Sequence, residues 1–200
     1  MASHRAQHVG AAELEEAGPL KQRLFFGLPV PAAQRALLGS YLERCAAAGP
    51  AFRWVPAANL HLTVRFLGSV PPGAAGEVGD RLAASRLRGF DIELGGAGTF
   101  GRGRKVRVVW IGLRAGGPAA TDLAATVDRA CAEVGLQGEE RAFQPHLTLA
   151  RSRHRDGEVL PELPPAPALQ AWRAAELILY RSRLSRAGAT YEPLRSLPLG

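Results

Sequence analysis

The chain has 200 residues, of which 46% are apolar and 22% charged, and this composition excludes a disordered or fibrous protein. The length allows one medium-sized domain or two small lobes. No apolar run reaches the roughly 20 residues that a membrane-spanning helix needs. The formal charge is +7, and all but two of the 25 basic residues are arginines. This favours an anionic partner, because the flat arginine fork suits phosphate.

The first twenty residues differ from the rest of the chain. Residues 1–20 have little apolar periodicity. They also lack the charged start and following apolar segment of a secretory signal, so we expect no such signal here. We predict that residues 1–20 are a mobile tail or a cloning remnant, and that residues 21–200 form one bilobal domain. We also expect a cytoplasmic protein. Cys45 and Cys131 form no disulfide framework and no metal-type pair, and both fall on apolar helix faces, so we expect them in the core.

The remaining sequence alternates predicted strands with predicted helices. We predict strands at 23–28, 52–55, 60–67, 90–94, 106–113, 143–150, 174–183 and 190–197, with a glycine-rich arm at 95–103. Apolar residues at helical spacing predict helices at 32–48, 74–87 and 119–134. This alternation indicates an α/β or an α+β domain.

The predicted elements also contain an internal repeat. The string LFFGL at 24–28, a helix and HLTV at 61–64 form one half, and VWIGL at 109–113, a helix and HLTL at 146–149 form the other. Gly27 precedes His61 by 34 residues, and Gly112 precedes His146 by 34 residues. Equal spacing with matching flanks predicts two similar lobes that pack together.

Each predicted histidine strand has one polar and one apolar face. Because strand residues two apart point the same way, His61, Thr63 and Arg65 share a face, opposite Leu62, Val64 and Phe66. By the same reasoning His146 and Thr148 share a face, opposite Leu147 and Leu149. The apolar faces belong in the lobe cores. If a two-fold relates the lobes, both polar faces can line one groove.

Two imidazoles across a groove have a direct chemical use. Histidine titrates at about 6.5, so one ring can be protonated near neutral pH while the other accepts a proton. The hydroxyls of Thr63 and Thr148 can donate hydrogen bonds to the non-bridging oxygens of a phosphate. In-line displacement at phosphorus, with acid and base on opposite sides, fits this arrangement.

Two other interpretations compete with this one. A single strand histidine is more often packed or exposed to solvent than catalytic, and threonine is a common strand residue. The duplication of the motif favours function. A zinc site would need further ligands, but neither motif carries a second histidine or a carboxylate on the same face. We therefore predict no metal and no other cofactor.

The paired HLT motifs resemble those of the 2H phosphoesterase superfamily, and their flanks resemble its RNA 2′,3′-cyclic phosphodiesterase branch (LigT/ThpR, the "2′-5′ RNA ligase" family). The matching strings occur in family order over about residues 22–199: RLFFGL at 23–28, WVP at 54–56, NLHLTVRFLG at 59–68, RVVW at 107–110, FQPHLTLAR at 143–151, ELILYRSRL at 176–184 and YEPL at 191–194. One departure is GRGR at 101–104, where relatives often carry a proline-containing turn.

The resemblance implies a bilobal α+β fold, a pseudo-two-fold duplication with two antiparallel sheets that face each other across a central cleft and helices on the outside. It also implies metal-independent opening of a terminal RNA 2′,3′-cyclic phosphate to a 2′-phosphate, with reversible 2′-5′ ligation as a further activity. His61 and His146 would be the catalytic pair, and Thr63 and Thr148 would bind the phosphate. We expect His61 as the acid and His146 as the base, although a symmetric site permits the reverse.

The resemblance suggests two more substrate contacts. Arg151 would contact the phosphate, but its position in the strand puts it on the face opposite His146 unless the strand bends or ends near residue 150. Phe26 would stack under a terminal base, or else pack in the core. A basic run at 102–107 could steer the RNA backbone, or be only a solvated face.

The expected partner is RNA with a 2′,3′-cyclic phosphate end, or a nucleotide fragment, with no membrane contact and a monomeric protein. Two alternatives stay open. The same chemistry could act on a small cyclic nucleotide or an ADP-ribose cyclic phosphate, or the groove could belong to a non-catalytic module that binds RNA or a nucleotide.

Overall fold

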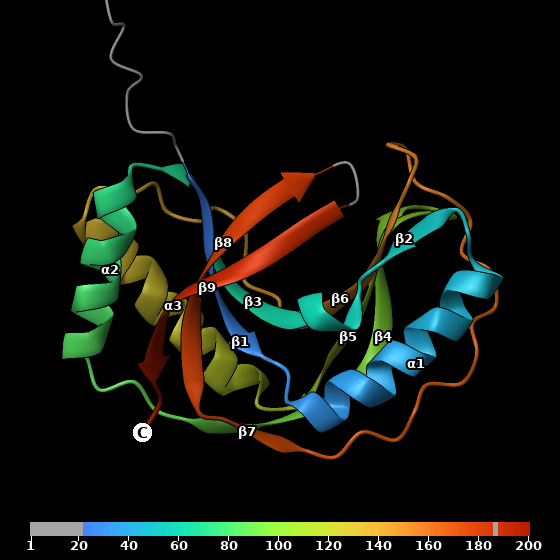
Figure 1. Cartoon of the computed structure of the whole chain (residues 1–200), viewed down its shortest axis with the longest axis horizontal. Coiled ribbons are helices and arrows are strands. Elements are labelled where there is room, and N and C mark those ends of the chain that lie inside the picture. The colour runs from blue at the N-terminus through green and yellow to red at the C-terminus, as the bar shows by residue number, and fades with distance from the viewer. Residues whose placement is uncertain (1–21, 186–187) are drawn as a thin grey trace, which may run out of the picture.

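A computed structural model of the chain describes residues 22–185 and 188–200, in which nine strands form one sheet with antiparallel neighbours (Figure 1). The strands are β1 (Gln22–Pro29), β2 (Phe52–Trp54), β3 (His61–Val70), β4 (Phe90–Arg102), β5 (Lys105–Ala115), β6 (His146–Ser152), β7 (Trp172–Ala174), β8 (Glu176–Ser185) and β9 (Gly188–Pro198). Their order is β7-β4-β5-β6-β3-β1-β8-β9, and β2 pairs with β6. The tail expected at residues 1–20 lies outside the described residues.

The sheet has two halves that meet at one place. β9, β8, β1 and β3 form the first half, and β6, β5, β4 and β7 form most of the second. They join where Leu62 of β3 pairs with Leu147 of β6. The α+β class predicted from the sequence is therefore confirmed, and the two expected sheets are halves of one continuous curled sheet.

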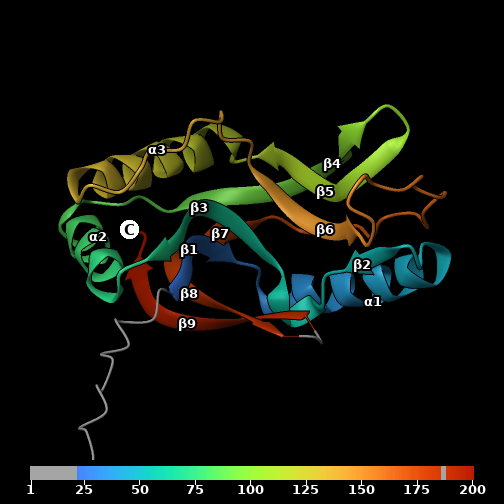
Figure 2. The same cartoon turned by 90° about the horizontal axis from the view of Figure 1, so that it is seen from above.

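The helices cover the outer faces of the sheet (Figure 2). They are α1 (Ala32–Ala48), α2 (Pro72–Ala84) and α3 (Gly117–Glu133), with a short 3-10 turn η1 (Ala57–Asn59). α2 and α3 pack together at one end and contact β3, whereas α1 contacts β2 and η1 at the other end. Within the described part of the chain, none of these helices has the length and hydropathy needed to cross a membrane.

Strand alternation separates the core from the inner face of the sheet. Leu24, Phe26 and Leu28 of β1 point into the core, where Phe26 has 0% of its surface exposed. The intervening residues of β1 face the other way. The core also contains Cys45 and Cys131, which are buried and unpaired as the sequence predicted.

Two elements differ from the sequence expectation. The glycine-rich arm predicted at 95–103 is the outer part of β4, paired with β5. Gly98 lies opposite Trp110 in this ribbon, and a Cβ atom there would overlap the indole ring, so the glycine is needed for close packing. β7 was not predicted, because three residues that pair with the first residues of β4 are too short a run to show alternation.

Candidate active site

Both HLT motifs flank the junction of the two halves. Leu62 and Leu147 pair directly, and both side chains are buried in the core. Antiparallel geometry places the chain neighbours of this pair on the opposite face, with His61 beside Thr148 and His146 beside Thr63. All four polar side chains are half-buried. The structure thus brings both predicted histidines and both predicted threonines to one face of one junction.

The two imidazoles are held in the same way. Nδ1 of His61 lies 2.7 Å from the carbonyl oxygen of Asn59, and Nδ1 of His146 lies 2.7 Å from that of Gln144. A carbonyl only accepts, so Nδ1 of each ring carries the proton and donates it. In the neutral ring Nε2 then has a free lone pair. Both rings can accept a proton at Nε2, and after accepting it can donate it.

A β-bulge follows each motif at the same position. On β3, Thr63 pairs with Gly27 and Arg65 with Phe26, which leaves Val64 without a partner. On β6, Thr148 pairs with Trp110 and Ala150 with Val109, which leaves Leu149 without one. An extra residue in one strand reverses which face the following residues take.

The bulges show that the predicted face of Arg65 is wrong. They also place Arg151 on the histidine face, which the predicted phosphate contact of Arg151 requires. Beyond Val64 the expected faces are exchanged, so Phe66 lies on the histidine face and Arg65 on the helix-covered face. Beyond Leu149 the same exchange brings Arg151 onto the face of His146 and Thr148. Phe66 and Arg151 therefore occupy equivalent places in the two halves.

Arg65 ties β3 to the segment that leads into β6. Its Nη2 donates to the carbonyl of Gln137 at 2.5 Å, and its Nη1 lies 3.2 Å from Oε2 of Glu139. Nε lies 2.9 Å from Oδ1 of Asp128 on α3, as an ion pair without hydrogen-bond alignment. This contact set fixes the segment that carries Arg141 and the carbonyl partner of His146.

Aromatic rings surround each imidazole. The ring of Phe25 lies 4.7 Å from that of His61, and Tyr191 makes an edge contact with His61 at 4.9 Å. On the other half, Phe100 makes an edge contact with His146 at 5.3 Å. The prediction that Phe26 stacks on a base is wrong, because Phe26 points into the core and offers no open ring face.

Both histidines are neutral at pH 7 in the free protein. Burial lowers the pKa of His61 to about 4, opposed by the Asn59 carbonyl and assisted by the charge of Arg151. Burial also lowers the pKa of His146, against the effect of the Gln144 carbonyl, and Arg151 again acts in the lowering direction. An anion bound between the rings would oppose these effects and raise both pKa values.

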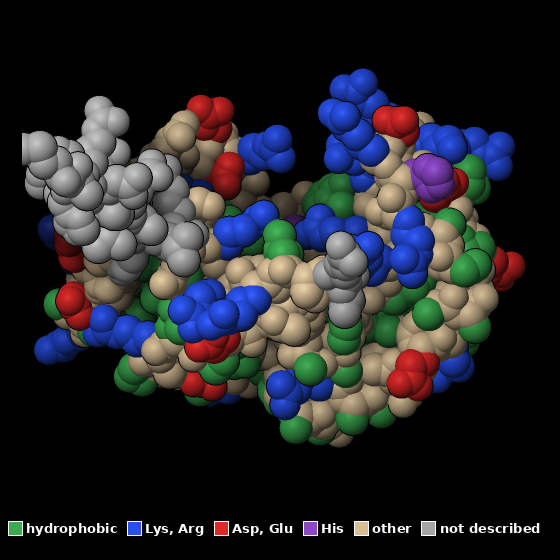
Figure 3. Space-filling model, turned by 45° about the horizontal axis from the view of Figure 1, so that its top comes forward, with side chains coloured by type: hydrophobic (Ala, Val, Ile, Leu, Met, Phe, Trp, Pro, Cys, Tyr) green, Lys and Arg blue, Asp and Glu red, His purple; other side chains and the backbone are tan. Residues whose placement is uncertain are grey.

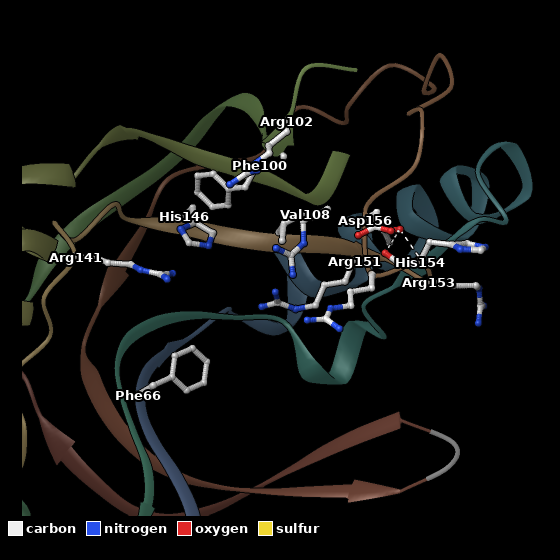
Figure 4. Close-up of a pocket in the computed structure, with 14 residues that line it drawn as sticks. Phe66, Phe100, Arg102, Val108, Arg141, His146, Arg151, Arg153, His154 and Asp156 are labelled. Atoms are coloured by element: carbon white, nitrogen blue, oxygen red, sulfur yellow. Dashed lines mark hydrogen bonds between the residues drawn. The ribbon is translucent and has the colours of Figure 1, made fainter. Parts of the chain in front are cut away.

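An arginine-lined groove of about 860 Å³ opens beside His146. The arginines that line it are Arg102, Arg107, Arg141, Arg151, Arg153 and Arg155. None of them lies within ion-pair distance of a carboxylate of the described residues. Figure 3 shows Lys and Arg side chains around a hollow on one face, and Figure 4 shows Arg141 and Arg151 extending into the space beside His146. We name this feature the arginine groove.

Several site residues were not found from the sequence. Phe66 and Phe100 line the arginine groove, as does Arg141. Phe66 could have been found from the repeat, since it precedes Arg151 by the same 85 residues that separate His61 from His146. Arg141 carries no such signal. Among the described residues, no three His, Cys, Asp or Glu side chains come together as a metal site.

The same chain matches a known family over most of its length. The model of the 2′-5′ RNA ligase superfamily matches residues 30–186. The chain belongs to this superfamily. A relative from Escherichia coli, named RNA 2′,3′-cyclic phosphodiesterase, is 36% identical over 177 residues, which are 87% of this chain and 94% of the relative.

Further comparisons agree with this membership. A Geobacillus stearothermophilus protein of the same name is 28% identical over 90% of this chain, and the match spans only 58% of its length. The crystal structure of E. coli LigT in apo form has a TM-score of 0.75 and 32% identity, covering 90% of this chain and 98% of that chain. The same protein is also solved in complex with 3′-AMP.

Proposed function

We propose that this protein hydrolyses the 2′,3′-cyclic phosphate at an RNA end to a 2′-phosphate, with His61 and His146 as acid and base and without a metal. The observation that carries the proposal is the matched pair of imidazoles, each donating from Nδ1 to a backbone carbonyl and each keeping Nε2 available. The names of the relatives support the substrate.

The reaction needs two proton transfers and one exchange of bonds at phosphorus. One neutral imidazole takes a proton from water at Nε2 as the water oxygen bonds to phosphorus. The other imidazole, protonated because the bound phosphate raises its pKa, gives its proton to O3′ as the P–O3′ bond breaks. Thr63 and Thr148 donate hydrogen bonds to the non-bridging oxygens, and Arg151 offsets their charge.

The arginine groove favours RNA over a mononucleotide. Six arginines along one groove suit a chain of phosphates, whereas a mononucleotide would reach only those next to His146. Backbone contacts release counterions, so kcat/KM for an oligonucleotide should fall more steeply with salt than that for a cyclic mononucleotide. Equal salt dependence would favour a small substrate.

The expectations of a monomer and of a cytoplasmic location stay predictions.

Hydrolysis of an RNA oligonucleotide with a 2′,3′-cyclic phosphate end, in excess EDTA, tests the proposal directly. We expect a 2′-phosphate product, and a loss of about 10²-fold or more in kcat for His61→Ala and for His146→Ala. Thr63→Val and Thr148→Val should each raise KM, with Thr126→Val on the exposed face of α3 as the matched control. Full activity in either histidine variant would refute the acid–base pair, and loss of wild-type activity in EDTA would refute metal independence.

The two histidine roles can be separated with a substrate whose 3′-bridging oxygen is replaced by sulfur. A thiolate leaves without protonation, so the variant that lacks the acid should recover much of its activity on this substrate. The variant that lacks the base should not recover, because the attacking water still has to lose its proton.

A further inference from the structure

The side chain of Asn59 joins two parts of the chain that lie 130 residues apart. Asn59 ends η1, the turn that leads into β3, and its Nδ2 donates a hydrogen bond to the carbonyl oxygen of Ala189 at 2.7 Å. Ala189 lies near the start of β9, an edge strand that pairs with β8. Among the described residues, this is the one hydrogen bond between residues 188–192 and any part of the chain outside β8 and β9. Asn59 therefore holds this end of β9 against η1.

The same residue also holds His61. The main-chain carbonyl oxygen of Asn59 accepts a hydrogen bond from Nδ1 of His61 at 2.7 Å. Tyr191, two residues beyond Ala189, makes an edge contact with the His61 ring at 4.9 Å. These contacts form a closed circuit, because Asn59 binds β9, β9 carries Tyr191, Tyr191 packs on His61, and His61 binds Asn59. The imidazole is thus enclosed between the turn that precedes β3 and the start of β9.

The second histidine has the same main-chain contact without this enclosure. Nδ1 of His146 donates to the carbonyl of Gln144, which is the equivalent of Asn59 in the repeat of 85 residues. The Gln144 side chain is exposed and makes no hydrogen bond in the described part of the chain. His146 itself lines the open arginine groove. Both halves therefore fix their histidine through a carbonyl, and the Asn59 side chain adds a second tie in one half.

We propose that Asn59 is a positioning residue for His61, because its side-chain hydrogen bond keeps Tyr191 on the imidazole and so fixes the ring and shields it from water. This inference rests on the proposed function, in which His61 transfers a proton. Asn59 acts through β9 and Tyr191, not by contact with the phosphate. Without the hydrogen bond the end of β9 is free to move away from η1, and the His61 ring gains both water and freedom to turn.

The pKa of His61 reports on this enclosure. The ring faces the uncharged Phe25 of β1, Tyr180 of β8, Tyr191 of β9 and the positive charge of Arg151 on β6. Burial raises the pKa of both tyrosines, so both are neutral at pH 7. Burial is the largest cause of the low pKa of His61, ahead of the Arg151 charge. Opening the enclosure should therefore raise the pKa of His61 from about 4 toward 6.5.

Asn59→Leu tests the proposal, since it removes the donor with little change in side-chain volume. We expect NMR titration to show a raised pKa for His61 and an unchanged pKa for His146. The kcat for hydrolysis of the RNA cyclic phosphate should fall about tenfold or more, because a small displacement of a proton-transfer group is costly, while KM stays near that of wild type. The acidic limb of the kcat/KM profile should move to higher pH. Gln144→Leu makes the matching change beside His146 and should leave the pKa of His61 as in wild type.

A double-mutant cycle tests whether Asn59 acts through Tyr191. Tyr191→Ala opens the enclosure from the other side and should also raise the pKa of His61. Adding Asn59→Leu to Tyr191→Ala should change this pKa little further, because both substitutions remove the same contact. A full additional rise in the double variant would show that Asn59 acts by another route and would overturn the proposal.

The outcomes separate this inference from the proposed function. An unchanged pKa of His61 in Asn59→Leu, with or without a fall in kcat, overturns the positioning role and leaves the hydrolase proposal standing. If the wild type forms no product, the hydrolase proposal fails, and the NMR titration still decides about Asn59 because it needs no turnover. Asn59→Ala replaces Asn59→Leu if the leucine lowers the melting temperature.

Discussion

Leu62 and Leu147 pair across the junction of β3 and β6, and each has only 1% of its surface exposed. The four polar residues of the candidate site flank this pair on the opposite face of the sheet. The spacing of the two imidazoles is therefore set by the core packing beneath them. A core substitution at this pair should therefore lower kcat, whereas a core substitution of the same size elsewhere should not.

Leu147→Ala tests this dependence. We expect the free energy of unfolding to fall by about 2–5 kcal/mol, as for other buried leucines, and kcat to fall as well because the junction loosens. Leu82→Ala removes an equally buried leucine from α2, far from the junction. It should cost similar stability but leave kcat near that of wild type. Urea unfolding and steady-state kinetics on both variants provide the measurement, and equal kcat in the two would contradict the prediction.

The pH dependence of kcat/KM should show an acidic optimum. The active free enzyme needs one protonated and one neutral imidazole, and burial lowers the pKa of both His61 and His146 below 6.5. The optimum lies between the two pKa values and so below pH 6.5. The optimum of kcat should lie at higher pH, since the bound phosphate raises both values. Coincident optima would mean that substrate charge does not act on the rings.

Stability should also depend on His61 at low pH. Its pKa is about 4 in the folded protein and about 6.5 when unfolded, so the unfolded chain binds more protons between these values. The contribution of the neutral ring is complete above pH 6.5 and is lost as pH falls to about 4. The wild type should lose about 3 kcal/mol more than His61→Gln over this range. Urea unfolding at both ends of the range measures the difference, and parallel curves would contradict it.

Arg151 should influence both rings at once. Its charge lowers the pKa of His61 and of His146, so Arg151→Gln should raise both and move the kcat/KM optimum to higher pH. Loss of a charged phosphate contact should also reduce kcat/KM by about 10- to 100-fold. Arg129→Gln, on the outer face of α3, removes the same charge away from the groove and should change neither quantity. NMR titration of the imidazoles would reveal whether only one ring responds, which would contradict the shared effect.

Arg65 should act as a positioning residue for the second histidine. Arg65→Met keeps the apolar stem but loses the contacts to Gln137, Glu139 and Asp128, at a cost of about 1–3 kcal/mol. The freed segment should let water reach His146 and raise its pKa toward the ordinary value, while the pKa of His61 stays unchanged. Arg81→Met breaks an exposed ion pair with Glu133 and provides the control. Equal pKa values for His146 in the two variants would reduce Arg65 to a stabilising role.

The juxtaposition of the two HLT motifs could be predicted from the sequence, because the repeat spacing and the alternation of polar and apolar residues can both be read directly from it. Periodicity placed His61 with Thr63 on one strand face and His146 with Thr148 on another, and the repeat suggested that a two-fold brings these faces together, as the pairing of β3 with β6 shows. The faces of Arg65, Phe66 and Arg151 could not be predicted, because one bulged residue reverses every later face and has no composition of its own. A hollow of about 530 Å³ lined by Tyr180 and Tyr191 could not be predicted either, because its walls come from segments far apart in the chain.

The equivalence of Phe66 and Arg151 gives the site a direction. In each half a histidine strand is followed by a bulge, and the next residue on the histidine face is Phe66 in one half and Arg151 in the other. Exchanging the halves would place one imidazole on the other and keep the Nδ1–carbonyl contact of each, yet it would put the cation of Arg151 where the ring of Phe66 stands. Under the proposed function, an RNA strand across the junction would meet an apolar ring on one side and a cation on the other, and this difference would favour one strand polarity.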